Sequence, residues 1–464
     1  MIRILPTPSG WPRVALARAG QYDPDAGLAD AERAGAWAAW RKASTSHTPE
    51  YVIRLVDAAR LRGRGGAGYP AAAKWRTCRA QDSDERYLVA NGYEADPGVA
   101  VARTLMELDP HGVVEGAVLA AFAAGAGEAV IAVKAEYALA IRRLTEAVEA
   151  ADNAGLIGIN AMNAGLDLRV TIRPVSGAFV LGEETVLLKA IEGRRGMPEQ
   201  RPPYPAVKGL FGRPTVVNSV ETLAAVPWIV QHGGEAFAAI GTPGATGTKL
   251  VQLSGAVRES GIAEVPLGTP VREIVTAVGG GLASGSRLKA VLVGGPAGGF
   301  LPAGELDVAL EPGALGAAGA ILGSGSLLVV DQHSCIVELG RLMERFMSDE
   351  SCGKCIPCRI GARRLYEIAD RVTGGRPRPT DVQLLADLSA DVRDGSLCGH
   401  GINAPNPLTS GMRYFAEEYA AHIEQGVCPA GVCRPLRVAT VAGSPSTAPA
   451  AGGTPGGRAA GASH

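Results

Sequence analysis

The sequence predicts an α/β fold in three parts, each with its own pattern of apolar residues. Between residues 48 and 246, apolar strands alternate with helical stretches, which predicts a mainly parallel sheet covered by helices. From 247 to 331, short strands surround one helix, which predicts a small β-grasp-like domain. From 332 to 438, apolar residues recur every three to four positions, which predicts a helical bundle.

The composition excludes several classes of protein. The 464 residues include 45 basic and 46 acidic side chains, so no basic field indicates binding to nucleic acid or to an anionic membrane. The longest uncharged run, 312–330, is diluted by glycine and serine, which predicts a buried strand with turns and not a membrane span. Eight cysteines suit a reducing compartment, and no signal peptide is evident, so we expect a cytoplasmic protein.

The N-terminal part leads to a glycine-rich loop. Residues 1–47 have few apolar anchors and are predicted to be an extension that either drapes over a neighbour or packs late. Thr48-Pro49-Glu50 predicts the start of a helix that ends near Leu61. The glycines that follow match G-x-G-x-x-G, but a dinucleotide fingerprint needs a preceding strand, and here a helix precedes them.

Two interpretations of this loop remain open. It is either a flexible surface loop or a place where the backbone approaches a ligand closely, as glycine allows. In the second case, Arg64 and Lys74 supply positive charge for a phosphate.

The strand predicted at 87–91 ends in a polar loop that contains Glu94 and Asp96. Ligands of open α/β sheets bind beyond the carboxyl ends of strands, so these acids are either site residues or ordinary turn residues. Further elements are predicted at 110–124, 129–134, 136–152 and 168–173, as helix, strand, helix and strand.

Gly182 is followed by the acids Glu183 and Glu184 at the start of a predicted helix. Acids at this position complement the helix N-terminus, or they form a carboxylate pair for the sugar hydroxyls of a nucleotide. The loop 193–209 carries several arginines and a proline-rich step, and the strand after it leads into a helix capped by Ser219.

Three cysteines, Cys352, Cys355 and Cys358, stand at C-x-x-C-x-x-C spacing, with Cys398 as the leading fourth ligand. Thiolates so placed suit an iron–sulfur cluster or zinc, and spacing alone does not separate the two. A surface disulfide with a stray thiol is the structural alternative.

The remaining cysteines are less informative. Cys428 and Cys433 with His422 leave a zinc site one ligand short, so a free or partner-shared thiol pair is favoured. Cys78 and Cys335 are interpreted as buried thiols. Residues 439–464 are predicted to be a disordered tail, because they have no large apolar side chain.

Taken together, six segments closely resemble the flavoprotein (NADH-binding) subunit of respiratory complex I and the related diaphorase subunits of NAD-dependent formate dehydrogenases and hydrogenases. They stand in the family's order over roughly residues 48–425. They are RGRGGAGYP at 62–70, LMELDPH at 105–111, GEETVLL at 182–188, PPYPAVKGLFGRPTVVNSVETL at 202–223, ESCGKCIPCR at 350–359 and SLCG at 396–399.

The resemblance implies a Rossmann-like domain that binds FMN and NADH, followed by one [4Fe-4S] cluster. NADH would pass a hydride to the flavin, and single electrons would then reach the cluster and a partner subunit. No catalytic acid or base is assigned. The FMN-binding residues would be Gly63, Arg64, Gly65, Lys74, Asn91, Glu94, Gly182, Asn218, Ser219 and Thr222. The NADH-binding residues would be Gly66, Tyr69, Asp96, Phe179, Glu183, Glu184, Arg201 and Tyr204. The cluster ligands would be Cys352, Cys355, Cys358 and Cys398.

The implied partners are a thioredoxin-like [2Fe-2S] subunit and a further iron–sulfur acceptor subunit. A membrane would be reached only indirectly, through a larger complex. The chain departs from the family's usual residues at Tyr93, Asp96, Phe179, Ser219 and Arg201. The alternative hypothesis is therefore a non-catalytic iron–sulfur scaffold subunit that has lost NADH turnover.

Overall fold

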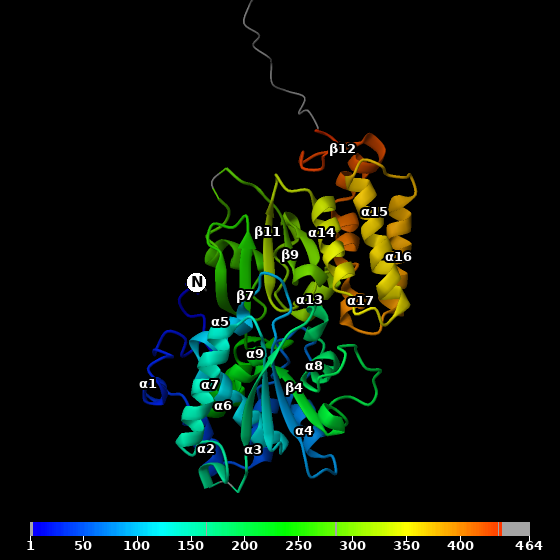
Figure 1. The fold of residues 1–464 in the computed structure, drawn as a ribbon. Helices are drawn as coiled ribbons and strands as arrows, with labels where there is room; N and C mark the ends of the chain where they lie inside the picture. Colours follow the sequence, from blue (N-terminus) through cyan, green and yellow to red (C-terminus); the bar gives the residue numbers. More distant parts are fainter. Residues whose placement is uncertain (1–2, 164, 284, 435, 439–464) are drawn as a thin grey trace, which may run out of the picture.

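The computed structural model describes residues 3–163, 165–283, 285–434 and 436–438. Figure 1 shows three packed parts: a parallel sheet with its helices, a second sheet above it, and a helical bundle beside the second sheet. The predicted mixed α/β architecture with a helical C-terminal region is confirmed. The predicted tail at 439–464 lies outside the described residues.

The first sheet is parallel throughout and has the strand order β3-β2-β1-β4. The chain moves from β1 to β2 and β3 on one side and then returns to place β4 on the other. The topological switch point, where open α/β sheets bind ligands, therefore lies between β1 and β4. The strands are β1 (Tyr87–Gly92), β2 (Glu128–Lys134), β3 (Arg169–Val175) and β4 (Thr215–Ser219).

Helices cover this sheet, and their local chemistry explains their bounds. Thr48 accepts a hydrogen bond from the amide of Tyr51 and caps α3, which begins at Pro49 as predicted. Every residue of α6 is buried, because this helix is apolar on all sides. The helices are α3 (Pro49–Ala58), α4 (Ala71–Arg79), α5 (Val101–Leu108), α6 (Pro110–Ala124), α7 (Ala138–Asn153), α8 (Glu184–Ile191), α9 (Val220–Ala224), α10 (Val226–His232) and α11 (Gly234–Ala238).

The N-terminal segment packs into the same core, which agrees with a segment that packs onto the chain itself, the second of the two alternatives. It carries α1 (Leu28–Arg33) and α2 (Ala38–Ser46). Trp37 and Trp40 are fully buried against the helices of the first sheet. The buried carboxylate of Glu115 accepts hydrogen bonds from the amides of Ala39 and Trp40. Two large buried anchors and a buried acid bonded to the start of α2 thus fix the segment.

The second sheet is mixed, in the order β10-β9-β11-β7-β8. Its central strands β7 and β11 are parallel, and the other neighbours are antiparallel. The strands are β7 (Thr248–Gly255), β8 (Gly261–Pro266), β9 (Leu288–Val293), β10 (Gly299–Pro302) and β11 (Ser326–Asp331). The small elements around them are β5 (Gly241–Thr242), β6 (Ala245–Thr246), α12 (Val271–Glu273), the π-helix Ile274–Val278 and α13 (Pro312–Ala317).

The uncharged run at 312–330 forms turns and most of β11, as predicted, and also the short helix α13, which was not predicted. Within the described ranges, no helix is both long and apolar enough to cross a membrane.

The bundle begins directly after β11. Its helices are α14 (Ile336–Asp349), the π-helix Pro357–Ala362, α15 (Arg363–Thr373), α16 (Asp381–Gly395), α17 (Gly399–Asn403), α18 (Asn406–Tyr414), α19 (Ala416–Ala420) and the π-helix Ala421–Gln425. The short strands β12 (Val427–Cys428) and β13 (Arg437–Val438) follow. Figure 1 shows α17 at the end of the bundle nearest the parallel sheet and β12 at the opposite end.

Candidate functional site

The polar ends of β1 and β4 meet at the switch point. Asn91 of β1 pairs in register with Ser219 of β4. The side-chain amide of Asn91 reaches the carbonyl of Gly182 at 3.5 Å, and the indole Nε1 of Trp75 donates to Asn218 Oδ1 at 2.8 Å. The two asparagines predicted from the resemblance therefore lie at the carboxyl edge of the sheet, and Trp75 of α4 fixes the orientation of one of them.

The glycine-rich loop lies against this edge. A Cβ built on Gly65 would stand 3.5 Å from Ser219 Cβ, and one built on Gly66 would stand 3.5 Å from the backbone of Gly323. Gly66 has φ +113°, a conformation that favours glycine. The amide of Arg64 donates to Thr222 Oγ1 at 2.9 Å. The loop is therefore held by the β4–α9 turn, and it is not a free surface loop.

The cations of the loop region have protein partners, which sequence reasoning did not anticipate. The buried Arg64 guanidinium donates to the carbonyls of Thr248 at 2.9 Å and Thr246 at 2.6 Å, and burial lowers its pKa to about 10. Lys74 Nζ contacts Glu184 Oε2 and the carbonyl of Val217, both at 2.9 Å. Arg64 thus fastens the loop to β6 and to the start of β7, while Lys74 holds α8 against β4.

The acid pair at the start of α8 caps the helix, as the first of the two interpretations predicts. Glu183 Oε2 accepts hydrogen bonds from the amides of Thr185 and Val186, which caps the helix. Its other oxygen, Oε1, is buried and has no hydrogen-bond partner among the described residues. Arg201 Nη1 lies 3.2 Å from Glu184 Oε1 and 3.7 Å from Glu183 Oε1. One carboxylate oxygen is therefore left to receive a hydroxyl donor.

Two exposed tyrosines belong to the predicted NADH-binding set, and one of them, Tyr204, is linked to the acid pair through Arg201. The side chain of Tyr69 is 54% exposed and that of Tyr204 is 57% exposed. The Arg201 guanidinium lies over the Tyr204 ring, 5.7 Å from its centroid. Exposed rings and paired acids suit a planar ligand with hydroxyl groups.

The loop after β1 is tightly bonded. Glu94 has φ +50°, and its carboxylate accepts hydrogen bonds from the amides of Ala102 and Arg103 at the start of α5, at 2.6 and 3.2 Å. Tyr137 Oη also donates to it at 3.2 Å. Burial raises the pKa of Glu94 to about 7 despite these donors. Asp96 accepts a hydrogen bond from the Ser324 hydroxyl, and its burial also raises its pKa.

A buried ion pair supports this loop from the second sheet. Lys249 is fully buried, and its Nζ donates to the Glu221 carboxylate. It also donates to the carbonyls of Leu250 and Ser324, in both cases at 3.0 Å. Glu221 Oε1 in turn accepts the amide of Leu250 at 2.7 Å. Sequence reasoning missed this pair. The available signal was a lysine within an apolar strand, since a buried lysine requires a partner.

The predicted cluster cysteines come together at the lower end of the bundle. Cys352, Cys355 and Cys358 lie between α14 and α15, and Cys398 directly precedes α17. A Cβ built on Gly401 would lie 2.9 Å from Cys358 Cβ, so α17 packs closely on the cysteine loop.

The thiols also interact electrostatically. Burial raises the pKa of Cys358 to about 12, and the charges of the other three thiolates add to this. Burial also raises the pKa of the Cys398 thiol, while the nearby amides of His400 and Gly401 act in the opposite direction. Four thiols that face one space, one of them held at a helix N-terminus, fit an iron–sulfur cluster.

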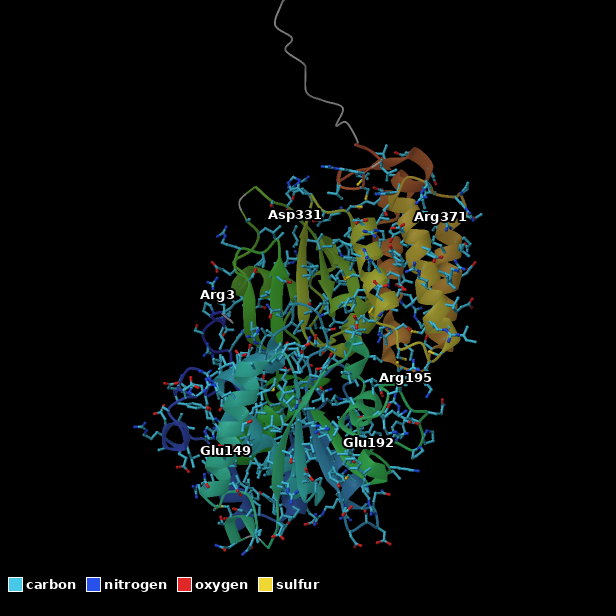
Figure 2. The ribbon with its side chains drawn as sticks, viewed as in Figure 1. Arg3, Glu149, Glu192, Arg195, Asp331 and Arg371 are labelled. Atoms are coloured by element: carbon cyan, nitrogen blue, oxygen red, sulfur yellow. The ribbon has the colours of Figure 1, made fainter. Side chains whose placement is uncertain are left out.

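Phe179 joins the two halves of the site. Its ring lies 5.4 Å from that of Phe346 and 5.5 Å from that of His400, both in the bundle. Its amide donates to Glu350 Oε2 at 2.6 Å. Between the segments 176–196 and 349–352 runs an open groove of about 340 Å³. Figure 2 shows Arg195, just beyond α8, below the lower end of the bundle.

The glycine loop and the asparagines thus lie at the carboxyl edge of the parallel sheet, and the four cysteines lie at the start of α17 and in the loop after α14. Two family models match the chain: the Nuo51 FMN-binding domain over residues 56–228, and the NADH-ubiquinone oxidoreductase-F iron-sulfur binding region over residues 338–422.

Relatives match over most of the chain. The NADP-reducing hydrogenase subunit HndC of Solidesulfovibrio fructosivorans is 43% identical, over 85% of this chain and 80% of its own length. An NADH-quinone oxidoreductase F subunit of Rhizobium meliloti is 39% identical, over 87% of this chain and 96% of its own length. A crystal structure of an NAD+-reducing [NiFe]-hydrogenase matches with a TM-score of 0.75 and 35% identity, over 84% of this chain. The chain spans 64% of that hydrogenase chain.

The chain therefore belongs to the family of NADH-quinone oxidoreductase F subunits and related hydrogenase flavoprotein subunits. It contains an FMN-binding domain and an iron–sulfur region.

Proposed function

We propose that this chain is an NADH-oxidising electron-entry subunit that works through FMN and one [4Fe-4S] cluster. The observation that carries the proposal is Phe179, which lies in the segment that leads to the acid pair of α8 and contacts Phe346 and His400 of the bundle. When bound, FMN accepts a hydride from NADH and the cluster takes electrons one at a time. The protein's share is to hold the two sites close together and in fixed orientation.

The residues proposed to hold FMN are those that surround the switch point. Asn91, Asn218 and Ser219 end the two central strands, and the glycine loop approaches them. We propose that Arg64 contacts FMN through its backbone, because its guanidinium is already hydrogen-bonded to the carbonyls of Thr246 and Thr248. The full proposed set is Gly63, Arg64, Gly65, Lys74, Asn91, Glu94, Gly182, Asn218, Ser219 and Thr222.

NADH is proposed to bind along the acid pair and its two tyrosines. The unpartnered oxygen of Glu183 suits a ribose hydroxyl, and the exposed rings of Tyr69 and Tyr204 suit the adenine. Phe179 and Asp96 would then border the nicotinamide. The full proposed set is Gly66, Tyr69, Asp96, Phe179, Glu183, Glu184, Arg201 and Tyr204.

Cys352, Cys355, Cys358 and Cys398 are the proposed cluster ligands, and their spacing favours a cluster over zinc. A single zinc ion with bonds of about 2.3 Å brings its ligand sulfurs to about 3.8 Å from one another. The structure describes one group of metal-type side chains whose ligand atoms all lie within 4.8 Å of one another. In the described part of the chain, that group does not include these four cysteines. A wider set of thiols supports a ligand that contains several metal ions.

The domain organisation is proposed as a Rossmann-like FMN and NADH domain at 48–246, a β-grasp-like domain at 247–331 and an iron–sulfur bundle at 332–438. The β-grasp proposal is supported by the second sheet, in which the first and last strands are central and parallel, with a hairpin on one side.

The proposed partners are a thioredoxin-like [2Fe-2S] subunit and a further iron–sulfur acceptor subunit. The relatives support this, because their names describe them as subunits of a hydrogenase and of an NADH-quinone oxidoreductase. The proposed location is the cytoplasm, with contact to a membrane only through such a complex.

The test is anaerobic purification of the full chain, followed by titration with NADH. We expect flavin absorbance that NADH bleaches, together with NADH:ferricyanide activity. Bound FMN that NADH leaves oxidised would refute the proposal.

The alternative is a scaffold subunit without NADH turnover. It is motivated by the loop after β1, where the Tyr93 hydroxyl donates to the carbonyl of Gly177 and Asp96 is bonded to Ser324. Robust ferricyanide reduction by the unmodified chain would eliminate it. If the unmodified chain is inactive and Asp96→Glu restores turnover, the shorter side chain of Asp96 is the cause of the lost NADH turnover.

Cys398→Ser tests the cluster assignment separately. The variant should lose the [4Fe-4S] signal in electron paramagnetic resonance while retaining FMN. A variant that keeps four iron atoms per chain would contradict Cys398 as a ligand.

A further inference from the structure

A second group of metal-type ligands lies in the bundle, away from the proposed cluster. Cys335, His422, Cys428 and Cys433 have ligand atoms that all lie within 4.8 Å of one another, and all four side chains are buried. We propose that these residues form a closed Cys₃His site for a single tetrahedral metal ion of the zinc class. This proposal stands independently of the proposed NADH chemistry.

Cys335 supplies the ligand that the sequence lacked. It lies 87 residues before His422, so spacing did not associate it with the other three. In the structure it caps α14, and its Sγ lies 3.4 Å from His422 Nε2 and 3.7 Å from Cys433 Sγ. From the sequence, Cys428 and Cys433 were interpreted as a free or partner-shared thiol pair, because the site lacked a fourth ligand. Cys335 supplies that ligand.

The separations fit one metal ion. Tetrahedral zinc, with bonds of about 2.3 Å to sulfur and about 2.0–2.1 Å to nitrogen, places two sulfurs about 3.8 Å apart and a sulfur and nitrogen about 3.6 Å apart. The distances from Cys335 Sγ to Cys433 Sγ and to His422 Nε2, 3.7 and 3.4 Å, are close to these. An iron–sulfur cluster places sulfide between its irons and would hold the ligands farther apart.

The surroundings of His422 fit a ligand as well. His422 Nδ1 donates a hydrogen bond to the carbonyl of Glu418 at 2.6 Å. Nε2 is therefore the nitrogen that faces the thiols. The Glu418 carboxylate accepts the amide of Ile336, the residue after Cys335, at 3.1 Å. One residue therefore positions two of the four ligands.

The site lies at the end of the bundle opposite the cluster. Cys335 precedes α14 and Cys352 follows it, and the 14 residues of this helix span about 21 Å. Figure 1 places β12, which contains Cys428, at the end remote from α17. Four protein ligands leave no open position for a substrate, so the metal's role is structural. It joins segment 427–434 to the first turn of α14 and to the π-helix at 421–425.

The test is metal analysis of the full chain, purified with its cofactors under anaerobic conditions. We expect about one zinc per chain beside the iron of the cluster. Cys433→Ser and Cys428→Ser should each lower zinc about tenfold, to below about 0.1 per chain, while iron is retained. Cys78→Ser, which changes a buried thiol in α4, is the matched control and should retain zinc. Cys398→Ser should lose iron and retain zinc.

A measurement on the unmodified chain covers the case in which the variants do not fold. Titration with a mercurial thiol reagent should release zinc to a chromogenic chelator, and cobalt substitution should give the intense visible bands of tetrahedral thiolate coordination. Three outcomes would overturn the proposal: zinc below about 0.1 per chain in the unmodified protein, extra iron and sulfide in place of zinc, or a disulfide between any two of the three cysteines by mass spectrometry.

Discussion

At the scale of single residues, the loop after β1 carries an unusual carboxylate. Glu94 lies in a left-handed conformation and accepts three hydrogen bonds, yet burial still brings its pKa to about 7. The group is therefore close to half protonated near neutral pH. Its charge state can change in the range where the protein works.

The raised pKa predicts how pH affects stability. Because the folded pKa exceeds the unfolded value of 4.5, folded Glu94 binds its proton more tightly. Proton binding by Glu94 therefore contributes to the free energy of unfolding, by at most about 3 kcal/mol. This contribution is full below about pH 4.5 and is lost as pH rises towards 7. Glu94→Gln should remove this part of the slope in urea unfolding of the flavin-free chain between pH 5 and 7. An unchanged slope would show that other groups produce it.

A second prediction concerns Arg201, which pairs with both acids of α8 and lies over Tyr204. Arg201→Ala should leave the carboxylates to repel each other and the nucleotide phosphates, which raises the KM for NADH by about 5- to 30-fold, or 1–2 kcal/mol. Steady-state kinetics and flavin content should be measured together. Arg194→Ala removes an exposed arginine nearby and should change KM less than twofold. Equal effects of both variants would exclude a specific role for Arg201.

At the scale of elements, the sequence predicted the strand–helix alternation, the start of α3 and the positions of α6 and β11, because these depend on local patterns. The resemblance assigned Asn91, Asn218 and Ser219 to one site, and the structure places them on paired strand ends of β1 and β4. The sequence could not predict the partners of Arg64, Lys249 and Cys335. Those contacts join residues that lie far apart in the chain.

The helix cap at α3 gives a prediction at this scale. Thr48→Ala removes the oxygen that accepts the Tyr51 amide, at 3.2 Å, and should lower the free energy of unfolding by about 1 kcal/mol. Thr48→Ser retains the acceptor and should cost less than half as much. Urea unfolding of both variants measures the difference, and equal losses would indicate that the methyl group matters more than the cap.

At the scale of the whole molecule, the two sheets are connected by buried charge. Lys249 of β7 binds Glu221 of α9, and its neighbour Leu250 donates to the same carboxylate. Burial lowers the pKa of Lys249 and Glu221 raises it. The pair lies close to Asp96 and the glycine loop, so it fixes the second sheet relative to the proposed flavin site.

Breaking this pair should be costly. Lys249→Met leaves Glu221 buried without its cation and should destabilise the chain by roughly 3–5 kcal/mol. The double variant Lys249→Met/Glu221→Gln removes both charges and should recover a large part of that loss. Arg76→Met breaks an exposed pair with Asp57 and should cost less than about 1 kcal/mol. Thermal unfolding of the four proteins tests this, and a double variant no better than the single one would contradict it.

Helix α14 is fixed at both of its ends, and this limits how its length can change. Cys335 and the amide of Ile336 are held at one end, and Glu350 bonds to the amide of Phe179 at the other. One inserted residue would rotate the far end by about 100° and move it by about 1.5 Å. Such an insertion would turn Cys352 away from Cys398. The number of residues in this helix is therefore as tightly constrained as the identity of the cysteines that it separates.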